Sequence, residues 1–169
     1  MQQDKMLLVK SKLSNLAPFQ IEKNCFAMVG WLMNAYFAEK KSAMSKEIIF
    51  SKEAPAPIGP YSQAVKSGNT LYVSGQIPLD ADTGELINEN ITEETHAVMK
   101  NLEAVLRAAG YGFEHVVKCS IFIKDMGQFA TINEAYGQYF KSNPPARETV
   151  EVARLPKDVN VEISCIAVK

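Results

Sequence analysis

The chain has 169 residues, of which 47% are hydrophobic and 22% are charged, and its formal net charge is −1. This composition is typical of a globular protein that builds its core without disulfide bonds, and it lacks the basic excess of nucleic-acid-binding proteins. Three cysteines without a CxxC pair, and only two histidines, argue against a disulfide framework, a zinc site and a histidine general base.

Residues 1–43 differ in composition from the rest of the chain. They include the uncharged stretch CFAMVGWLMNAYFA, which at 14 residues is shorter than the roughly 20 that a membrane-spanning helix needs. Three interpretations of this segment stay open: a segment upstream of a native start at Met44, a docking helix, and a targeting sequence. We predict an N-terminal extension over residues 1–43 and one folded domain over residues 44–169.

The first part of the domain is predicted to be a strand, a loop and a hairpin. The strand covers Glu47–Phe50, and the extended loop APAPIGPY follows it. The hairpin has strands over residues 63–66 and 70–74, and its turn is SGN, where Gly68 and Asn69 are suited to positive φ.

A long helix comes next. Thr92 is a suitable N-cap, and the two glutamates that follow it are favoured by the helix dipole in the first turn. Apolar residues recur at helical spacing from Val98 to Ala109, and Gly110 is suited to the C′ position that ends a helix.

The second half of the domain is predicted to hold three strands and a second helix. The segment His115–Asp125 alternates between apolar and polar residues, which is typical of a strand. The helix covers Met126–Lys141, and two further strands cover Glu148–Arg154 and Val161–Val168. The order β-β-β-α-β-α-β-β indicates an α+β fold, a mixed sheet with two helices on one face. Because the other face would also carry apolar side chains, we expect self-association to cover it.

Two charged residues stand out as candidates for chemistry. Arg147 directly follows the rigid pair Pro144-Pro145, and a guanidinium held in one geometry is suited to bind a carboxylate. A salt bridge at a strand edge is the alternative. Glu162 lies in the apolar segment VNVEISCIAV, where partial burial would raise its pKa toward neutrality and suit it to proton transfer. A solvent-facing position on an edge strand is the alternative for Glu162.

Several polar or small residues are further candidates. Tyr61 in IGPYSQA is expected to donate a hydrogen bond to a ligand or to pack. Ser74 and Gly75 in SGQIP place a small step at a strand end, where glycine permits close approach of the backbone. Asn133 on the second helix faces either solvent or a cleft, and Cys165 is most simply a small core residue.

Together these segments resemble the RidA/YjgF family of reactive-intermediate (enamine/imine) deaminases. The motifs that carry the resemblance are IGPYSQA, LYVSGQIP, VKCSIFIKDM, NEAYGQYF, PPARETVEVARLP and VEISCIAV. They occur in the family's order and spacing, and they cover essentially all of residues 44–169. Residues 1–43 have no counterpart in the family pattern.

The resemblance implies a fold, an assembly and a reaction. The fold is chorismate-mutase-like, and the assembly is a homotrimer with active sites in the clefts between subunits. The reaction is hydrolysis of 2-iminobutanoate and 2-iminopropanoate, released as enamines by pyridoxal-phosphate enzymes, to 2-oxo acids and ammonia. We expect a cytoplasmic enzyme that needs neither metal nor cofactor and has no nucleic-acid or membrane partner.

The resemblance also assigns roles to residues. The carboxylate-binding arginine falls on Arg147 and the water-positioning glutamate on Glu162. Backbone groups near Gly75 and from Ile163 to Cys165 are expected to hold the developing amine. Other residues implied in substrate binding are Tyr61, Ser74, Asn133 and Thr149, the last standing where many bacterial members have a cysteine.

Two other functions stay open. The first is a non-catalytic trimer that binds 2-oxo acids, and the second is an RNA-acting inhibitor of translation. The near-neutral net charge disfavours the second function.

Overall fold

The computed structural model describes residues 30–31, 34 and 46–169 of the protein. Apart from residues 30–31 and 34, the predicted N-terminal extension and its border at Met44 lie outside the described residues. The domain boundary therefore stays a prediction. No helix in the described ranges has both the length and the apolar character needed to cross a membrane.

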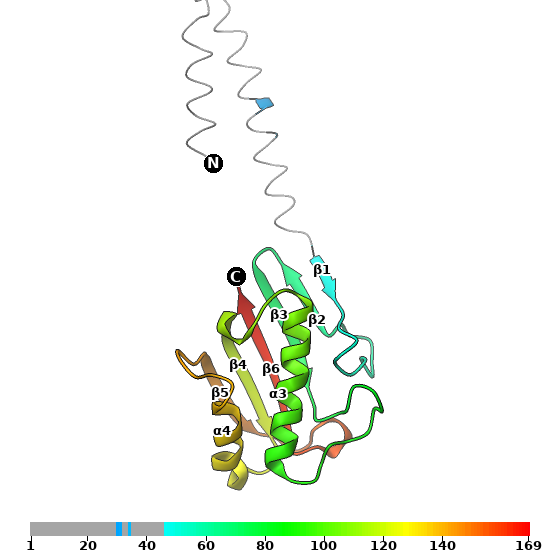
Figure 1. The fold of residues 1–169 in the computed structure, drawn as a ribbon, viewed down its shortest axis with the longest axis vertical. Coiled ribbons are helices and arrows are strands. Elements are labelled where there is room, and N and C mark those ends of the chain that lie inside the picture. The colour runs from blue at the N-terminus through cyan, green and yellow to red at the C-terminus, as the bar shows by residue number, and fades with distance from the viewer. Residues whose placement is uncertain (1–29, 32–33, 35–45) are drawn as a thin grey trace, which may run out of the picture. The chain divides into compact units, whose positions relative to one another are not determined.

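One mixed sheet of six strands forms the centre of residues 46–169, in the order β1-β2-β3-β6-β4-β5 (Figure 1). Its neighbouring strands are antiparallel except for β4 and β5, which are parallel. The strands are β1 (Lys46–Ile49), β2 (Ala64–Ser67), β3 (Thr70–Gln76), β4 (Val116–Ile123), β5 (Ala146–Glu151) and β6 (Val161–Val168). With helix α3 (Ile91–Ala108) before β4 and helix α4 (Phe129–Gly137) before β5, the predicted β-β-β-α-β-α-β-β order is confirmed.

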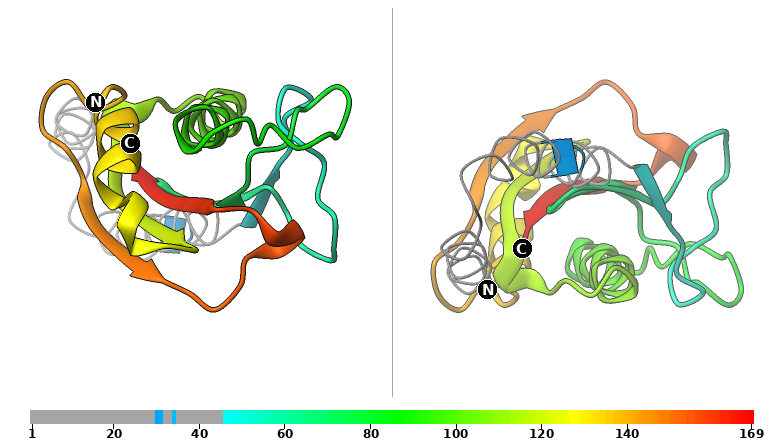
Figure 2. Two further views of the ribbon diagram at one scale, coloured as in Figure 1. Left: turned by 90° about the horizontal axis from the view of Figure 1, so that it is seen from below. Right: turned by 90° about the horizontal axis from the view of Figure 1, so that it is seen from above.

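Both helices cover one face of the sheet (Figure 2). Alternate residues of β6 point toward the helices and are buried, among them Val161, Ile163 and Ala167. They pack with the apolar face of α3, which includes Leu102 and Leu106. The predicted α+β architecture with two helices on one face is therefore correct.

Helix boundaries differ from the sequence-based predictions. The N-cap of α3 is Asn90 and not Thr92, because the Asn90 side chain accepts a hydrogen bond from the Glu93 amide at 3.0 Å. Helix α4 ends at Gly137, well before Lys141, and the next residues form tighter i→i+3 hydrogen bonds. A short 3₁₀ turn, Met126–Gln128, comes before α4, and the Asp125 side chain caps it by accepting a hydrogen bond from the Gly127 amide.

The sheet face opposite the helices carries exposed apolar side chains. Tyr72 on β3 is 51% exposed and Val150 on β5 is 43% exposed. Large apolar side chains in contact with water are unfavourable, so the expectation that another protein surface covers this face stands as a prediction.

Candidate functional site

A β-bulge in β3 forms the starting point of the site. Val73 pairs with Cys165 and Gln76 pairs with Ile163, so β3 has one residue more than β6 over this stretch. The bulge lies at Ser74 and Gly75, next to the carboxylate of Glu162. A Cβ atom on residue 75 would lie 1.9 Å from Glu162 Oε1, so only glycine leaves room for this carboxylate.

A hollow of about 220 Å³ opens beside the bulge. Residues from three loops and two strands line it, and most of its walls are apolar. They are Ile58, Tyr61, Ser74, Gly75, Ile77, Pro156 and Glu162. Glu162 is thus the one carboxylate in an otherwise uncharged lining.

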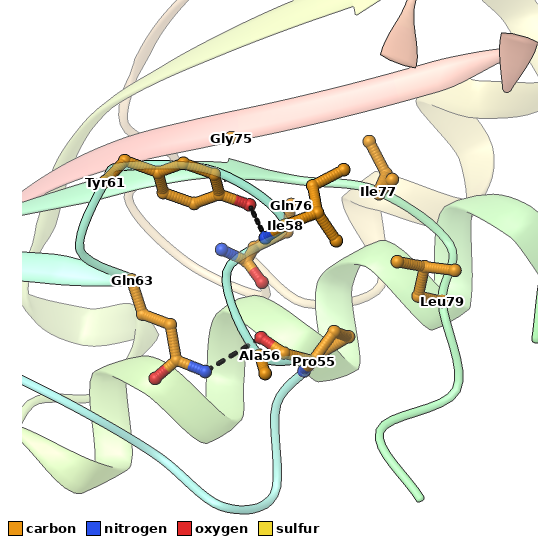
Figure 3. Close-up of a pocket in the computed structure, with 9 residues that line it drawn as sticks. All are labelled: Pro55, Ala56, Ile58, Tyr61, Gln63, Gly75, Gln76, Ile77 and Leu79. Carbon is orange, nitrogen blue, oxygen red and sulfur yellow. Dashed lines mark hydrogen bonds between the residues drawn. The ribbon is translucent and has the colours of Figure 1, made fainter. Parts of the chain in front are cut away.

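The two hydroxyl groups of the hollow are partly engaged. The Tyr61 hydroxyl accepts a hydrogen bond from the Ile58 amide at 3.3 Å, so its own proton is available to a ligand (Figure 3). The Ser74 hydroxyl donates to the Ser62 carbonyl at 2.7 Å, so Ser74 can offer a ligand only acceptor capacity.

Glu162 is half-buried, and burial raises the pKa of its carboxyl group above the ordinary value of 4.5. The described residues place no cation or hydrogen-bond donor beside this carboxylate that would lower the pKa again. A carboxylate with a raised pKa is a better proton acceptor at neutral pH, which suits Glu162 to general base chemistry.

Arg147 begins a second group of predicted residues, on β5. Its guanidinium donates a hydrogen bond of 2.6 Å to Asn133 Oδ1 on α4. It also lies over two aromatic rings of α4, 5.6 Å from the centre of Phe129 and 5.2 Å from that of Tyr136. Within the described ranges, no carboxylate lies within ion-pair distance of Arg147, so the salt-bridge alternative finds no support there.

Two buried hydroxyl groups lie near this arginine without a hydrogen-bond partner among the described residues. They are those of Thr149, which shares the face of β5 with Arg147, and Tyr136. Burial is also the main cause that raises the pKa of Tyr136 well above its ordinary value. The Tyr136 hydroxyl faces the Cys119 thiol, a weak hydrogen-bonding group, so the Thr149 hydroxyl is the one suited to bond to water or a ligand.

The two groups lie on opposite faces of the sheet of one chain. Arg147 pairs with Cys119, which is buried under the helices, whereas Glu162 pairs with Phe122, which points to the other face. All seven predicted residues other than Cys165 fall into these groups. The first group holds Tyr61, Ser74, Gly75 and Glu162, and the second holds Asn133, Arg147 and Thr149. A single chain therefore does not bring Arg147 and Glu162 to one ligand.

Cys165 belongs to neither group. Its side chain is 4% exposed and lies in the core beside Cys119, and burial strongly raises the pKa of its thiol. Any ligand contact by Cys165 would have to come from its backbone.

Sequence analysis also missed residues that shape the two groups. Ile58 and Ile77 lie in the motifs IGPYSQA and SGQIP, but only their polar neighbours were singled out. Phe129 and Tyr136 belong to the apolar stripe of α4, and their spacing with Asn133 places all three on one helix face. That spacing is the sequence signal from which the two aromatic residues could have been linked to Asn133.

Comparisons with known proteins agree on one family. The family model described as endoribonuclease L-PSP matches residues 51–169. A RutC family protein of Pyrococcus horikoshii is 52% identical over 124 residues, which is 73% of this chain and 98% of that protein. The human protein named 2-iminobutanoate/2-iminopropanoate deaminase is 44% identical over 128 residues, which is 76% of this chain and 93% of that protein.

A solved structure shows the same fold. The crystal structure of E. coli TdcF with bound serine superposes with a TM-score of 0.70 at 42% identity. The match covers 73% of this chain and 98% of TdcF.

Proposed function

The chain belongs to the RidA/YjgF family, whose model is described as endoribonuclease L-PSP, and we propose that it hydrolyses small 2-imino acids to 2-oxo acids and ammonia. The preferred substrates are 2-iminobutanoate and 2-iminopropanoate. The name of the human relative supports this substrate class. The serine bound to TdcF supports it too, because serine is a small amino acid.

The observation that carries the proposal is the state of Arg147. Its guanidinium is fixed by Asn133 and two aromatic rings, yet it has no carboxylate partner in residues 46–169. A fixed, unpaired guanidinium can bind the substrate carboxylate through two parallel hydrogen bonds. Because little further motion is lost on binding, the imine carbon is held in one position for attack.

Glu162 supplies the proton transfers of the reaction. Its carboxylate takes a proton from a water molecule as the water oxygen bonds to the imine carbon. Glu162 passes this proton to the nitrogen, which gives a carbinolamine. The carboxylate then carries the hydroxyl proton of the carbinolamine to the nitrogen, the C–N bond breaks, and ammonia leaves as the C=O bond of the 2-oxo acid forms. An imine is already electrophilic, so one base and one group that binds the substrate carboxylate are sufficient.

The lining of the hollow favours a small aliphatic side chain on the substrate. Ile58, Ile77 and Pro156 provide apolar contacts, and the volume of about 220 Å³ suits a molecule of a few carbon atoms. The Tyr61 hydroxyl has a free proton that can bond to the substrate.

The active site requires two copies of the chain. Arg147 and Glu162 lie on opposite sheet faces, so the Arg147 group of one copy must meet the Glu162 group of another. We propose that the chains form a homotrimer in which each cleft between subunits holds one such site. This assembly would also cover the exposed apolar side chains of the open sheet face.

A coupled assay tests the reaction. A pyridoxal-phosphate dehydratase releases 2-iminobutanoate from threonine, and the rate of 2-oxobutanoate formation is measured with and without the protein. We expect faster formation with the wild-type chain and none of this gain with Arg147→Ala, and most of the gain should also be lost with Arg147→Lys. Arg107→Ala, which removes an exposed arginine paired with Glu53, is the matched control and should behave like wild type.

Unchanged formation of 2-oxobutanoate would contradict the proposal. If the wild-type chain then binds 2-oxobutanoate in calorimetry and Arg147→Ala does not, the site is a 2-oxo-acid sensor.

RNA cleavage is a second candidate because the family model carries the description of an endoribonuclease. Neither histidine lies in the two groups: His96 bonds to the Tyr139 hydroxyl and His115 to the Gly112 amide. A cleavage assay with single-stranded RNA checks this candidate, and we expect no cleavage that depends on Arg147 or Glu162.

A further inference from the structure

Three buried polar side chains that do not line the hollow form hydrogen bonds to the loops around it, one for each loop. Gln63 bonds to the backbone of Ser51 and Pro55, below the loop that carries Ile58 and Tyr61 (Figure 3). Asn101 on α3 donates to the carbonyls of Ile77 and Leu79. Glu94 on α3 holds Asn160, next to β6. Of the three, Glu94 is the one that bonds to the segment leading into the proposed base, Glu162.

Glu94 is a buried carboxylate bound to a single residue. Its side chain is 1% exposed, and its two oxygens accept hydrogen bonds from the Asn160 amide at 3.1 Å and from Asn160 Nδ2 at 2.6 Å. No cation within residues 46–169 forms an ion pair with it. A buried charge is costly unless well bonded, so both hydrogen bonds and the N-terminal end of α3 are needed to stabilise it.

The segment that Glu94 holds leads directly into Glu162. In the preceding turn, Pro156–Asp158, Lys157 and Asp158 have φ values of 53° and 59°. Residues other than glycine rarely adopt such values. Pro156 of this turn lines the hollow, and Asn160 lies two residues before Glu162. The Asn160 carbonyl in turn accepts a hydrogen bond from the Lys124 amide of the neighbouring chain segment at 3.0 Å.

We infer that Glu94 is a positioning residue, whose hydrogen bonds to Asn160 set where the Glu162 carboxylate and Pro156 stand in the hollow. Glu94 touches no substrate, and it acts through the backbone of β6. The expected effect on kcat rests on the proposed function. The expected effect on the position of the segment around Asn160 does not. A displaced base is expected to lower kcat and to leave KM nearly unchanged, because Arg147 still binds the substrate carboxylate.

A swap of the two hydrogen-bonding groups tests this inference. In Glu94→Gln, a neutral amide replaces the carboxylate, so the two charge-assisted hydrogen bonds with Asn160 are weakened. In Asn160→Asp, two carboxylates face each other. In the double variant Glu94→Gln with Asn160→Asp, the backbone amide of residue 160 still donates to the side chain at position 94, and the side-chain bond forms with donor and acceptor exchanged. The net charge of the chain is unchanged. Glu93→Gln, at the exposed neighbour, is the matched control.

Two readouts are needed, and the first does not involve activity. Hydrogen exchange of the Asn160 amide, followed by NMR, should be slow in wild type and in Glu93→Gln, faster in both single variants of the pair, and slow again in the double variant. The kcat of the single variants should fall by about 10-fold or more and recover in the double variant.

The inference is overturned if Glu94→Gln keeps wild-type exchange and kcat, or if the double variant recovers neither. If the wild-type chain shows no imine hydrolysis at all, the proposed function fails, and the exchange pattern alone still decides whether Glu94 positions this segment.

Discussion

Gly75 and Glu162 share one small space at the bulge of β3, and this makes Gly75 a sensitive probe of the site. We predict that Gly75→Ala lowers kcat by about 100-fold, because the new methyl group must push the Glu162 carboxylate aside. The fold should persist, since the atoms that the methyl group meets are the mobile end of a side chain.

Enzyme assays and thermal unfolding of purified Gly75→Ala check this prediction. Gly137→Ala is the matched control, because nothing lies within 4 Å of its added Cβ atom. Wild-type kcat in Gly75→Ala would show that the carboxylate is not needed where the structure places it.

The raised pKa of Glu162 has a consequence for stability. Because the folded state binds this proton more tightly than the unfolded state, wild type loses stability as the pH rises from 4.5 through the folded-state pKa. Glu162→Gln cannot ionise, so it should be more stable than wild type at neutral pH, and the difference should shrink as the pH falls toward 4.5.

Melting temperatures of both proteins over this pH range measure the effect in one oligomeric state. An equal difference at every pH, or a less stable variant at neutral pH, would mean that burial does not raise this pKa.

Arg147 and Glu162 were predictable from sequence as chemical types but not as partners. A carboxylate in an apolar strand and an arginine after two prolines are visible in the sequence. What holds Arg147, however, is the set of side chains of α4 and not the prolines alone. That contact depends on tertiary packing, which local spacing does not determine.

The N-cap of helix α3 gives a prediction about the stability of this element. The Asn90 side chain caps the helix, so Asn90→Ala should lower the free energy of unfolding by about 1 kcal/mol. Thr92→Ala is the informative control, since Thr92 is the N-cap that the sequence suggested and the structure places it inside the helix.

Chemical denaturation of both variants measures this difference. A larger loss for Thr92→Ala than for Asn90→Ala would contradict the cap that the structure shows.

The order and type of the elements followed from sequence because their periodic patterns are strong. The alternation in β4 and the helical spacing in α3 each reflect one buried face. The β-bulge left no such mark, because an extra residue in β3 becomes visible only against its pairing partner β6. The site lies at this bulge, so its geometry could not be derived from one strand alone.

For the molecule as a whole, the sheet presents two faces with different parts of one proposed site. The helix face carries Arg147 with Asn133, and the open face carries Glu162 with exposed apolar side chains such as Tyr72. The sequence predicted the open apolar face, but it could not predict that the two charged residues would be separated by the sheet. This separation makes the proposed activity a property of the assembly.

The most direct test of this account mixes two inactive variants. Arg147→Ala and Glu162→Gln chains are dissociated, combined in equal amounts and reassembled, and imine hydrolysis is measured beside each variant alone. If each site takes Arg147 from one copy and Glu162 from another, about a quarter of the sites regain both groups, and about a quarter of wild-type activity should return. Mixed oligomers that form, as native mass spectrometry can verify, but show no gain in activity would contradict a site shared between copies of the chain.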